Sequence, residues 1–411
     1  MKYDRVELKE LCSLSQGLQI PIAERFRDDG PNRYFYITVQ FLKDNSDKYF
    51  IENPPERVKC NSEDILVVRT GNTGQIITGV DGCFHNNFFK VEPNEKIYPK
   101  FLYYTLKSPE LYTRMRNVAS GTTILDLKHS AFLGLDIYLP DLANQKKIAN
   151  ILDLIDQKIK NCESINNNLE QFSQNLFKKW FIDFDLKNDF GICEDFKDSS
   201  LGEIPQSWEI RTVGELSDVK GRIGWRGYTT NDLVDDGPWV IGGKEITSGF
   251  IDFSSAKHLT REKYEESPEI MLKDKDLIIA KTGTIGPIAM FYEGFGEATL
   301  NPNVGLIRSK NISPALLLTF FKTPRAQYYL NEFTTSSVQP AINQTTIKQL
   351  EVALPSDISL LNKISLIFDE INDIQYNLIE GVKKLSILRD TLLPKLMSGE
   401  VDVSKINCDS D

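Results

Sequence analysis

One short motif in the chain has the residue types of a methyl-transfer site. Asn-Pro-Pro followed by an aromatic residue is typical of enzymes that methylate the amino group of a flipped base, where the aromatic ring stacks on that base. Here Asn53-Pro54-Pro55 is followed by Glu56, so the stacking ring is missing. No strand–GxG–helix unit for adenosylmethionine precedes the motif. We therefore interpret it as a turn and keep a stand-alone adenine methyltransferase as an alternative.

Two glycine-containing segments have residues that could contact phosphate. Arg69-Thr70-Gly71-Asn72-Thr73-Gly74 and Lys281-Thr282-Gly283-Thr284-Ile285-Gly286 each follow a short apolar run. Neither has the Gly-Lys-Ser/Thr ending of a P-loop. A strand that leads into a glycine turn explains both segments on structural grounds alone. They also supply a matched set of candidate DNA contacts: Arg69, Thr70, Lys281 and Thr282.

Basic and aromatic side chains gather in two further loops, which do not match each other. Arginine can read guanine in the major groove through two hydrogen bonds. A solvated charged loop explains these clusters equally well. The candidate DNA contacts are Arg25, Arg27 and Arg33 in one loop, and Lys220, Arg222, Trp225 and Arg226 in the other.

The three histidines, His85, His129 and His258, are isolated and show neither metal-ligand nor triad spacing. We predict no catalytic residue and no metal ligand in this chain.

The sequence that contains these candidate contacts has an internal repeat. Ile97-Tyr98-Pro99 recurs as Ile312-Ser313-Pro314, and the run Asp64–Gly74 recurs as Asp276–Gly286. A repeat of about half the chain is far longer than the roughly 20 to 50 residues of a solenoid unit. It predicts two domain-sized copies with pseudo-twofold symmetry, which suits a two-sided partner such as duplex DNA.

A long apolar seam ends each copy. Steps of three and four residues from Ile148 and from Ile364 meet almost only apolar side chains. This pattern indicates two coiled-coil helices that pair with each other, about 43 Å long at 1.5 Å per residue. An amphipathic helix lying on a globular domain is the alternative. The predicted helix-pair interface is Ile148, Ile151, Ile155, Leu169, Phe172, Leu176, Ile364, Ile367, Ile371, Leu385, Leu388 and Leu392.

The predicted fold class is α+β. Two β-rich domains in a pseudo-twofold inverted arrangement are separated by an antiparallel pair of long coiled-coil helices. The predicted boundaries are a first domain at 1–140, a central helix at 141–185, a linker at 186–203, a second domain at 204–355, a C-terminal helix at 356–400 and an acidic tail at 401–411.

The charge and the cysteine content limit the partners and the cellular compartment that we expect for this chain. The net charge is −10, but the excess of acidic residues lies mainly outside the two predicted domains. If DNA is bound, we expect a partner subunit to neutralise part of its phosphate charge. No apolar run approaches the roughly 20 residues of a membrane helix, and no secretory signal is expected. Six scattered cysteines fit a reducing cytoplasm.

At this point the sequence resembles the specificity (S) subunit of type I restriction-modification systems. The resemblance rests on Leu201-Gly202-Glu203-Ile204-Pro205-Gln206-Ser207-Trp208-Glu209, on the two Thr-Gly-x-x-Gly turns, and on Leu393-Pro394-Lys395-Leu396-Met397-Ser398-Gly399-Glu400 after the second seam. It covers essentially the whole chain.

The resemblance implies a non-catalytic subunit that binds double-stranded DNA. Each repeat domain would recognise one half of a bipartite, asymmetric site. The helices would set the spacer and dock two modification (methyltransferase) subunits. This chain would bind no cofactor: S-adenosylmethionine would belong to the modification subunits, and ATP and Mg would belong to restriction (motor–nuclease) subunits where these join. A scaffold that binds only protein is the second alternative to this function.

Overall fold

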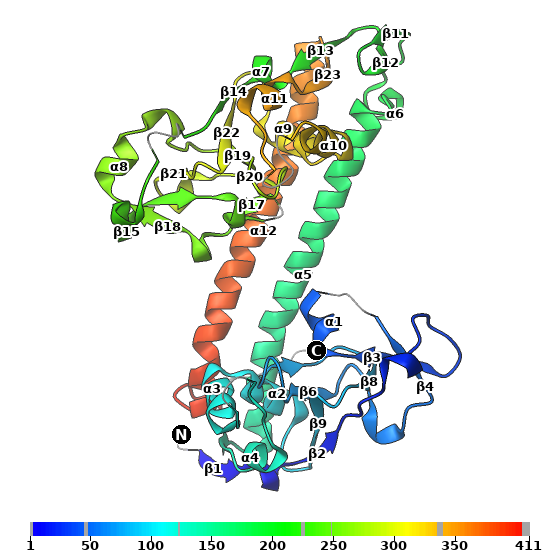
Figure 1. The fold of residues 1–411 in the computed structure, drawn as a ribbon, viewed down its shortest axis with the longest axis vertical. Helices are drawn as coiled ribbons and strands as arrows, with labels where there is room; N and C mark the ends of the chain where they lie inside the picture. Colours follow the sequence, from blue (N-terminus) through cyan, green and yellow to red (C-terminus); the bar gives the residue numbers. More distant parts are fainter. Residues whose placement is uncertain are drawn as a thin grey trace. The chain divides into compact units, whose positions relative to one another are not determined.

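The computed structural model of the chain describes residues 3–44, 48–121, 124–222, 227–247, 249–334 and 340–404. The chain forms two compact units (Figure 1). Unit 1 is Met1–Cys162 with Gly381–Asp411, and unit 2 is Glu163–Glu380. Each unit therefore contains one part of each long helix. Among the described helices, none is long and apolar enough to cross a membrane.

Unit 1 is built on two four-stranded sheets, with strand orders β2-β9-β6-β7 and β4-β3-β8-β5, and a separate antiparallel pair β1-β10. Its strands are β1 Asp4–Glu7, β2 Cys12–Gln16, β3 Arg33–Ile37, β4 Phe50–Glu52, β5 Lys59–Cys60, β6 Ile65–Val68, β7 Ile76–Ile77, β8 Gly82–Phe84, β9 Phe88–Pro93 and β10 Asp136–Leu139. Its short helices are α1 Val39–Asp44, α2 Pro99–Lys107, α3 Pro109–Val118 and α4 His129–Leu133.

Unit 2 repeats this plan with sheets β14-β22-β19-β20 and β18-β15-β21 and the antiparallel pair β13-β23. Its strands are β11 Phe196–Ser199, β12 Gly202–Pro205, β13 Trp208–Thr212, β14 Ser217–Lys220, β15 Leu233–Ile241, β16 Ile246–Thr247, β17 Phe250–Ile251, β18 Lys257–Leu259, β19 Leu277–Ala280, β20 Ile288–Met290, β21 Ala298–Leu300, β22 Val304–Ser309 and β23 Glu351–Pro355. Its short helices are α6 Lys187–Phe190, α7 Val213–Leu216, α8 Arg261–Glu265, α9 Pro314–Phe321, α10 Pro324–Glu332 and α11 Gln344–Gln349.

The two units share the order of their central strands. The order β2-β9-β6-β7 corresponds to β14-β22-β19-β20, and the parallel pair β3-β8 corresponds to β15-β21. The helices that begin at Pro99 and Pro314 are α2 and α9, where proline suits the first helical turn because its missing N–H would have no helical partner there. The predicted duplication of an α+β domain is therefore confirmed.

Two long helices, α5 Leu142–Phe181 and α12 Ile358–Ser398, follow the two repeats. In unit 2 the Gln375 amide donates to the Asn166 carbonyl at 3.5 Å, and the Phe177 and Phe368 rings lie 6.3 Å apart. In unit 1 Arg389 donates to Asp156 at 2.9 Å. Higher numbers on α5 thus meet lower numbers on α12, so the helices pair in the antiparallel sense within each unit.

Both helices also complete the core of the unit in which they lie. In unit 1, Ile148 and Leu152 of α5 share a buried cluster with Leu396 of α12. In unit 2, Phe177 and Trp180 of α5 share one with Phe368 of α12. Each long helix therefore pairs with the other and also covers a domain. The coiled-coil interpretation and the interpretation as an amphipathic helix on a domain thus each describe one face of these helices.

The seam positions predicted from the 3–4 spacing are only partly buried. Ile148, Ile364 and Ile371 are buried. The half-buried positions are Ile151, Ile155, Leu169, Leu176, Ile367, Leu385 and Leu392. Phe172 and Leu388 are exposed, at 51% and 45%. For these two residues the predicted place in the helix-pair interface is wrong, since neither is covered by the partner helix.

Polar residues explain the difference in register. Ser173, Asn372 and Gln375 are each only 5% exposed. The hydroxyls of Ser173 and Thr319 lie 3.2 Å apart. A hydrophobic pattern cannot place buried polar side chains. A straight helix also drifts by about 20° per heptad from an exact seven-residue repeat. The buried face of α5 therefore shifts from Phe172 to Ser173 and Phe177.

The predicted segment boundaries can be placed on these elements. The predicted central helix, 141–185, corresponds to α5, and the predicted C-terminal helix, 356–400, to α12. The predicted linker, 186–203, contains α6 and part of the β11–β12 hairpin. Of the predicted tail, residues 401–404 are described, and Val403 is buried in unit 1.

The shifted register gives a matched pair of phenylalanines on α5 for a stability test. Phe177 is 3% exposed and stacks on Phe181 with a centroid distance of 4.6 Å. We expect Phe177→Ala to lower the free energy of unfolding by about 3–5 kcal/mol, because it leaves a cavity in an aromatic core. Phe172→Ala should change it by less than about 1 kcal/mol. Urea unfolding followed by tryptophan fluorescence measures both variants, and equal losses would mean that the seam has the register predicted from sequence.

Candidate nucleic-acid interface

The two Thr-Gly-x-x-Gly segments form the same turn in both units. Each follows a buried strand, β6 or β19, and leads into its hairpin partner, β7 or β20. The amide of Gly74 donates to the Val68 carbonyl at 2.8 Å, and that of Gly286 donates to the Ala280 carbonyl at 3.1 Å. Gly74 and Gly286 have φ of 88° and 103°, a region that favours glycine. The turn itself therefore requires these glycines.

The basic residue that begins each turn is held by equivalent backbone bonds. The Arg69 amide donates to the Asn87 carbonyl at 2.7 Å, and the Lys281 amide donates to the Asn303 carbonyl at 3.0 Å. The carbonyls of Arg69 and Lys281 accept from the amides of Leu127 and Ile342, at 3.1 and 2.9 Å. Arg69 and Lys281 thus occupy equivalent positions in the two repeats.

The side chains at this position differ between the units. Arg69 forms two hydrogen bonds with Asp126, at 2.6 and 3.0 Å, and these bonds hold the pKa of the Asp126 carboxyl below its ordinary value. The backbone bridge of Thr70 with Asp126 corresponds to that of Thr282 with Ala341, so alanine stands where unit 1 has the carboxylate. No acidic side chain among the described residues pairs with Lys281, whose pKa is lowered by burial.

The neighbouring threonines follow the same division. The Thr70 hydroxyl donates to the side-chain oxygen of Asn87 at 2.9 Å. Within the described part of unit 2, neither the Thr282 hydroxyl nor the side-chain amide of Asn303 has a hydrogen-bond partner; Thr282 is half-buried and Asn303 exposed. The side chains of Thr70 and Asn87 therefore bond to each other in unit 1, whereas those of their unit 2 counterparts, Thr282 and Asn303, bond to no described residue.

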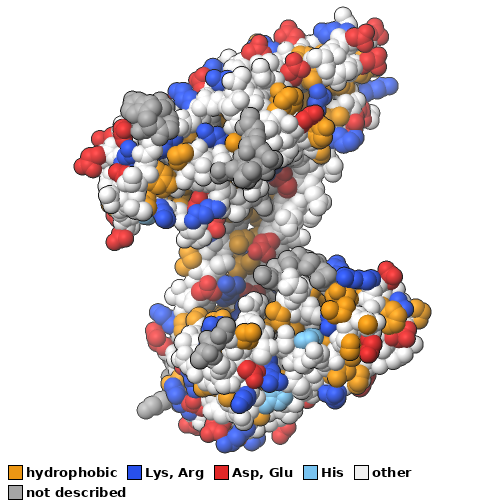
Figure 2. All heavy atoms as spheres, viewed as in Figure 1, with side chains coloured by type: hydrophobic (Ala, Val, Ile, Leu, Met, Phe, Trp, Pro, Cys, Tyr) orange, Lys and Arg blue, Asp and Glu red, His pale blue; other side chains and the backbone are white. Residues whose placement is uncertain are grey.

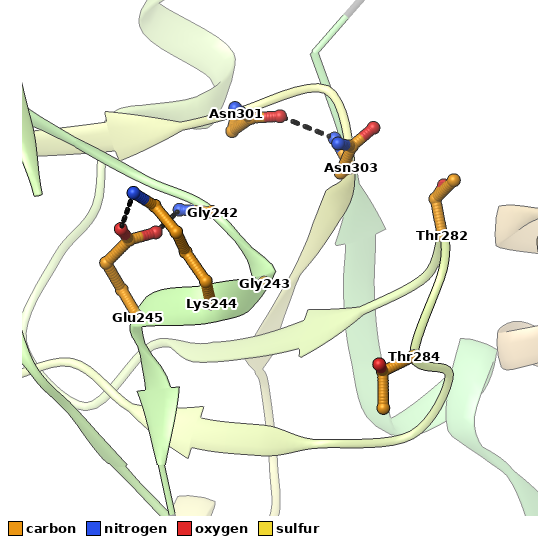
Figure 3. A pocket seen from close by; sticks show the side chains of 8 residues that line it. All are labelled: Gly242, Gly243, Lys244, Glu245, Thr282, Thr284, Asn301 and Asn303. Carbon is orange, nitrogen blue, oxygen red and sulfur yellow. Dashed lines mark hydrogen bonds and ion pairs between the residues drawn. The ribbon is translucent and has the colours of Figure 1, made fainter. Parts of the chain in front are cut away.

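A polar pocket of about 410 Å³ opens beside the second turn (Figure 3). Figure 3 shows Thr282 and Thr284 on the turn between β19 and β20, and Asn303 on the loop before β22. Its lining residues are Gly242, Gly243, Lys244, Glu245, Thr282, Thr284, Asn301 and Asn303.

The acid in this lining is satisfied internally. Glu245 is 2% exposed and accepts the Gly242 amide at 3.0 Å and the Ser255 hydroxyl at 3.0 Å, and it pairs with Lys244 at 3.4 Å. Asn301 is also committed, since its amide donates to the Tyr228 hydroxyl at 2.8 Å. The exposed polar groups of the pocket are therefore uncharged or cationic.

The predicted basic loop of unit 1 is a set of stacked side chains. Arg33 lies over the Phe26 ring at 3.6 Å, and Arg27 lies over the Tyr49 ring at 4.2 Å. Arg25 donates to the Ile20 carbonyl at 2.7 and 2.9 Å. The structure thus brings these three arginines together on an aromatic support, and Arg25 holds the loop in place.

The predicted loop of unit 2 does not present its arginine at the surface. Arg222 is 5% exposed and donates to the Leu300 carbonyl at 2.8 Å and to Thr299 at 3.1 Å. Burial lowers its pKa. Arg222 therefore supports the fold from inside, whereas Lys220, at the end of β14, is half-exposed. Trp225 and Arg226 lie outside the described residues.

Sequence reasoning missed the asparagines before β9 and β22. The backbone amide of Asn303 donates to the side-chain oxygen of Asn301 at 2.9 Å, and the backbone amide of Asn87 donates to His85 Nδ1 at 3.1 Å. Burial lowers the pKa of His85 to about 4, so the ring is neutral and can accept this bond. The signal in the sequence was the pair His85-Asn86-Asn87 and Asn301-Pro302-Asn303, each directly before an apolar strand.

The methyltransferase-like motif is a bend. Asn53 has a φ of 46° and donates its amide to the Asn32 carbonyl at 2.9 Å, after β4 and before the 3-10 helix Glu56–Val58. Asparagine tolerates this left-handed conformation. The structure thus agrees with the interpretation of the motif as a turn.

Charge on the visible face of each unit is mixed. Figure 2 shows lysine and arginine side chains interspersed with aspartate and glutamate rather than gathered in one field. Specific contacts at matched positions are therefore the stronger indication of a binding site.

Comparison with known proteins gives one family match. The profile of the family "Type I restriction modification DNA specificity domain" matches residues 2–171 and again residues 205–384. The chain is 24% identical over 388 residues to the type I restriction enzyme MjaVIII specificity subunit of Methanocaldococcus jannaschii, covering 91% of this chain and 87% of that protein. It is 25% identical over 342 residues to the MjaIX specificity subunit of the same organism, covering 78% and 73%.

One solved structure shares the fold. The crystal structure of the S subunit of a type I restriction-modification system from M. genitalium superposes with a TM-score of 0.61 at 16% identity, covering 97% of this chain and 96% of that one.

The Arg69–Asp126 pair predicts a pH-dependent contribution to stability. Because the folded pKa of Asp126 lies below its unfolded value, the contribution is fully present above the unfolded pKa, about 3.9, and is lost as pH falls through the folded pKa. Asp126→Asn should lower the free energy of unfolding by about 1 kcal/mol at pH 7, and the difference from the unmodified chain should shrink below about pH 4. The control is Glu95→Gln, an exposed site. Urea unfolding at pH 7 and pH 3 tests this, and parallel pH profiles for both variants would contradict it.

Proposed function

This chain belongs to the family of type I restriction modification DNA specificity domains, and from that premise we propose that it is the non-catalytic DNA-recognition subunit of a cytoplasmic type I restriction-modification complex. Its proposed ligand is a bipartite, asymmetric site in double-stranded DNA. Each unit recognises one half of this site.

The observation that carries this proposal is a duplicated scaffold with different side chains at equivalent positions. The turns at Arg69 and Lys281 have the same backbone hydrogen bonds, but Arg69 forms an ion pair whereas Lys281 pairs with no acidic side chain among the described residues. Repeated backbones place two surfaces in equivalent settings, while different polar groups give each surface its own base preference. A site with two unlike halves is the DNA counterpart of such a protein.

The paired helices act as the spacer in this proposal. Polar contacts between α5 and α12, such as Arg389 with Asp156 and Gln375 with Glu170, supplement the apolar packing and favour one register. Buried polar groups are known to fix the register of paired helices. The number of unread base pairs between the half-sites is then set by helix length.

The modification subunits dock on the outer faces of these helices. Large apolar side chains remain exposed there: Leu154 and Ile387 in unit 1, at 63% and 59%, and Leu366 in unit 2, at 60%. Exposed apolar residues on a regular surface are typical of protein interfaces. Two modification subunits, which bind S-adenosylmethionine, would methylate adenine on the two strands, and restriction subunits that use ATP and Mg can join for cleavage.

Methylation mapping tests the function directly. We expect a host that carries this chain with its modification subunit to methylate adenines in one bipartite motif, and we expect this methylation to disappear when the chain is omitted. Long-read sequencing measures both. Methylation that persists without the chain, or never appears with it, would favour the scaffold alternative. Methylation by the isolated chain would favour the stand-alone methyltransferase.

Shortening both helices by one heptad tests the spacer. Because residue 156 faces 389 and residue 166 faces 375, the opposed segments to delete, which lie between these two contacts, are 158–164 and 379–385. Removing seven residues shortens each helix by about 10 Å, which is the length of about three base pairs at 3.4 Å each. We expect the methylated motif to keep both half-sites and to lose about three unread base pairs. Deleting only one of the two segments is the control and should disrupt assembly, while an unchanged spacer in the double deletion would contradict the role of the helices.

A further inference from the structure

Backbone pairing fixes which residues of the two repeats correspond around the second turn. The carbonyl of Ile37 accepts the His85 amide at 3.0 Å, and the carbonyl of Ile241 accepts the Asn301 amide at 2.7 Å. Ile37 and Ile241 are therefore equivalent. The residues that follow them, Thr38-Val39 in unit 1 and Gly242-Gly243 in unit 2, occupy the same place in the fold.

The exchange of valine for glycine opens the pocket in unit 2. In unit 1 a methyl carbon of Val39 lies 3.3 Å from the point where a Cβ on the turn residue Gly71 would sit, so Val39 lies against the turn, although Gly71 and Asn72 are themselves exposed. In unit 2 the equivalent Gly243 has no side chain. Within the described residues, nothing lies within 4 Å of the Cβ position of Gly283, the counterpart of Gly71. The pocket of about 410 Å³ lies beside the turn of unit 2. The corresponding turn of unit 1 is in contact with Val39.

Two further differences between the units also leave polar groups at the turn of unit 2 without a partner among the described residues. Asp126 neutralises Arg69 in unit 1, whereas Ala341 leaves Lys281 without a carboxylate partner among the described residues. The hydroxyl of Thr70 is bonded to Asn87, whereas Thr284 and Asn303 are exposed, with side chains that bond to no described residue. Two substitutions and one hydrogen bond that only unit 1 forms thus distinguish the two turns.

The chemistry of the open turn fits the edges of DNA bases. Pockets for small organic ligands are lined mostly by apolar side chains, whereas no large apolar side chain lines this one. An asparagine amide can bond an adenine edge at two atoms, and a threonine hydroxyl can bond any base. Gly242 and Gly243 allow a rigid duplex to approach the backbone closely, and Lys281, which directly precedes the lining residue Thr282, can contact a phosphate.

We propose that unit 2 recognises its half-site through this pocket, with Thr284 and Asn303 contacting base edges and Lys281 contacting a phosphate, and that the equivalent turn of unit 1 is closed and reads no base. The inference rests on the proposed function, because it assigns residues to one half of the bipartite site. It makes the two repeats unequal: the same turn is a reading element in one and a structural element in the other.

Refilling the pocket tests the proposal without removing any polar group. Gly243→Val introduces the side chain found at Val39. The space permits it, since a Cβ on Gly243 would meet only the Ala280 Cβ, at 3.6 Å. We expect the variant to keep its thermal unfolding midpoint and to lose discrimination at the unit 2 half-site by about tenfold or more, with the other half unchanged. Competition binding of bipartite duplexes altered in one half at a time, by the complex with its modification subunits, measures this.

A second pair of variants covers the case in which the valine disturbs folding. Asn303→Ala should relax the same half-site by a similar factor. Asn87→Ala, its matched control in unit 1, should leave base discrimination in both halves unchanged. Retained discrimination in Asn303→Ala would overturn the reading role of the pocket. Relaxed discrimination at the first half-site in Asn87→Ala would overturn the closed state of the first turn.

Binding by the complex of the unmodified chain distinguishes a failure of the proposed function from a failure of the pocket assignment. If its complex shows no preference for any bipartite duplex, the proposed function fails. If it has such a preference and Gly243→Val and Asn303→Ala both keep it, only the assignment of the pocket fails. Lys281→Ala adds an independent readout: we expect weaker binding to all duplexes and a shallower salt dependence by about one phosphate contact.

Discussion

The structure depends on the requirement that each unit complete its core with helices from both ends of the sequence. In unit 1 the sheet side chains pack with Ile148 and Leu152 of α5, but also with Leu393 and Leu396 of α12. In unit 2 the α5 residues Phe177 and Trp180 meet Phe368 of α12. Neither β-rich domain covers its apolar face with its own short helices alone. The two domains can therefore complete their cores only when α5 and α12 pair.

This constraint acts on the apolar faces, and several side chains of the two turns are free to vary. The backbone bonds of Arg69 and Lys281 to Asn87 and Asn303 are the same in both units, so the turn geometry is set by main-chain atoms and by glycines with positive φ. Side chains around the turn that lie outside the buried core, unlike Ile285, can then be exchanged. Val39 for Gly243 is one such exchange. A scaffold held by its backbone is a suitable base for changing specificity.

The sequence was sufficient to predict the duplication, the helices that begin at Pro99 and Pro314, and the long paired helices, because repeats and periodicity are local patterns. It was insufficient for the helix register, since the exposure of Phe172 depends on buried polar residues such as Ser173. It also could not show that Arg222 is buried beneath a strand that lies far away in sequence. The partner of Arg69, Asp126, is likewise distant, so a matched pair of basic residues proved unequal.

The division of the cores has a consequence for the order in which the chain acquires structure during synthesis. Unit 1 contains Leu8 and Leu11, which leave the ribosome before any part of unit 2, yet its core also includes Leu393, Leu396 and Val403, which are made after all of unit 2. Unit 2 contains all its own residues once position 380 has emerged. The half that is translated first is therefore finished last, and its apolar face stays uncovered while the other half is made. Domains usually mature from the N-terminus onward during translation; here the order of completion is reversed.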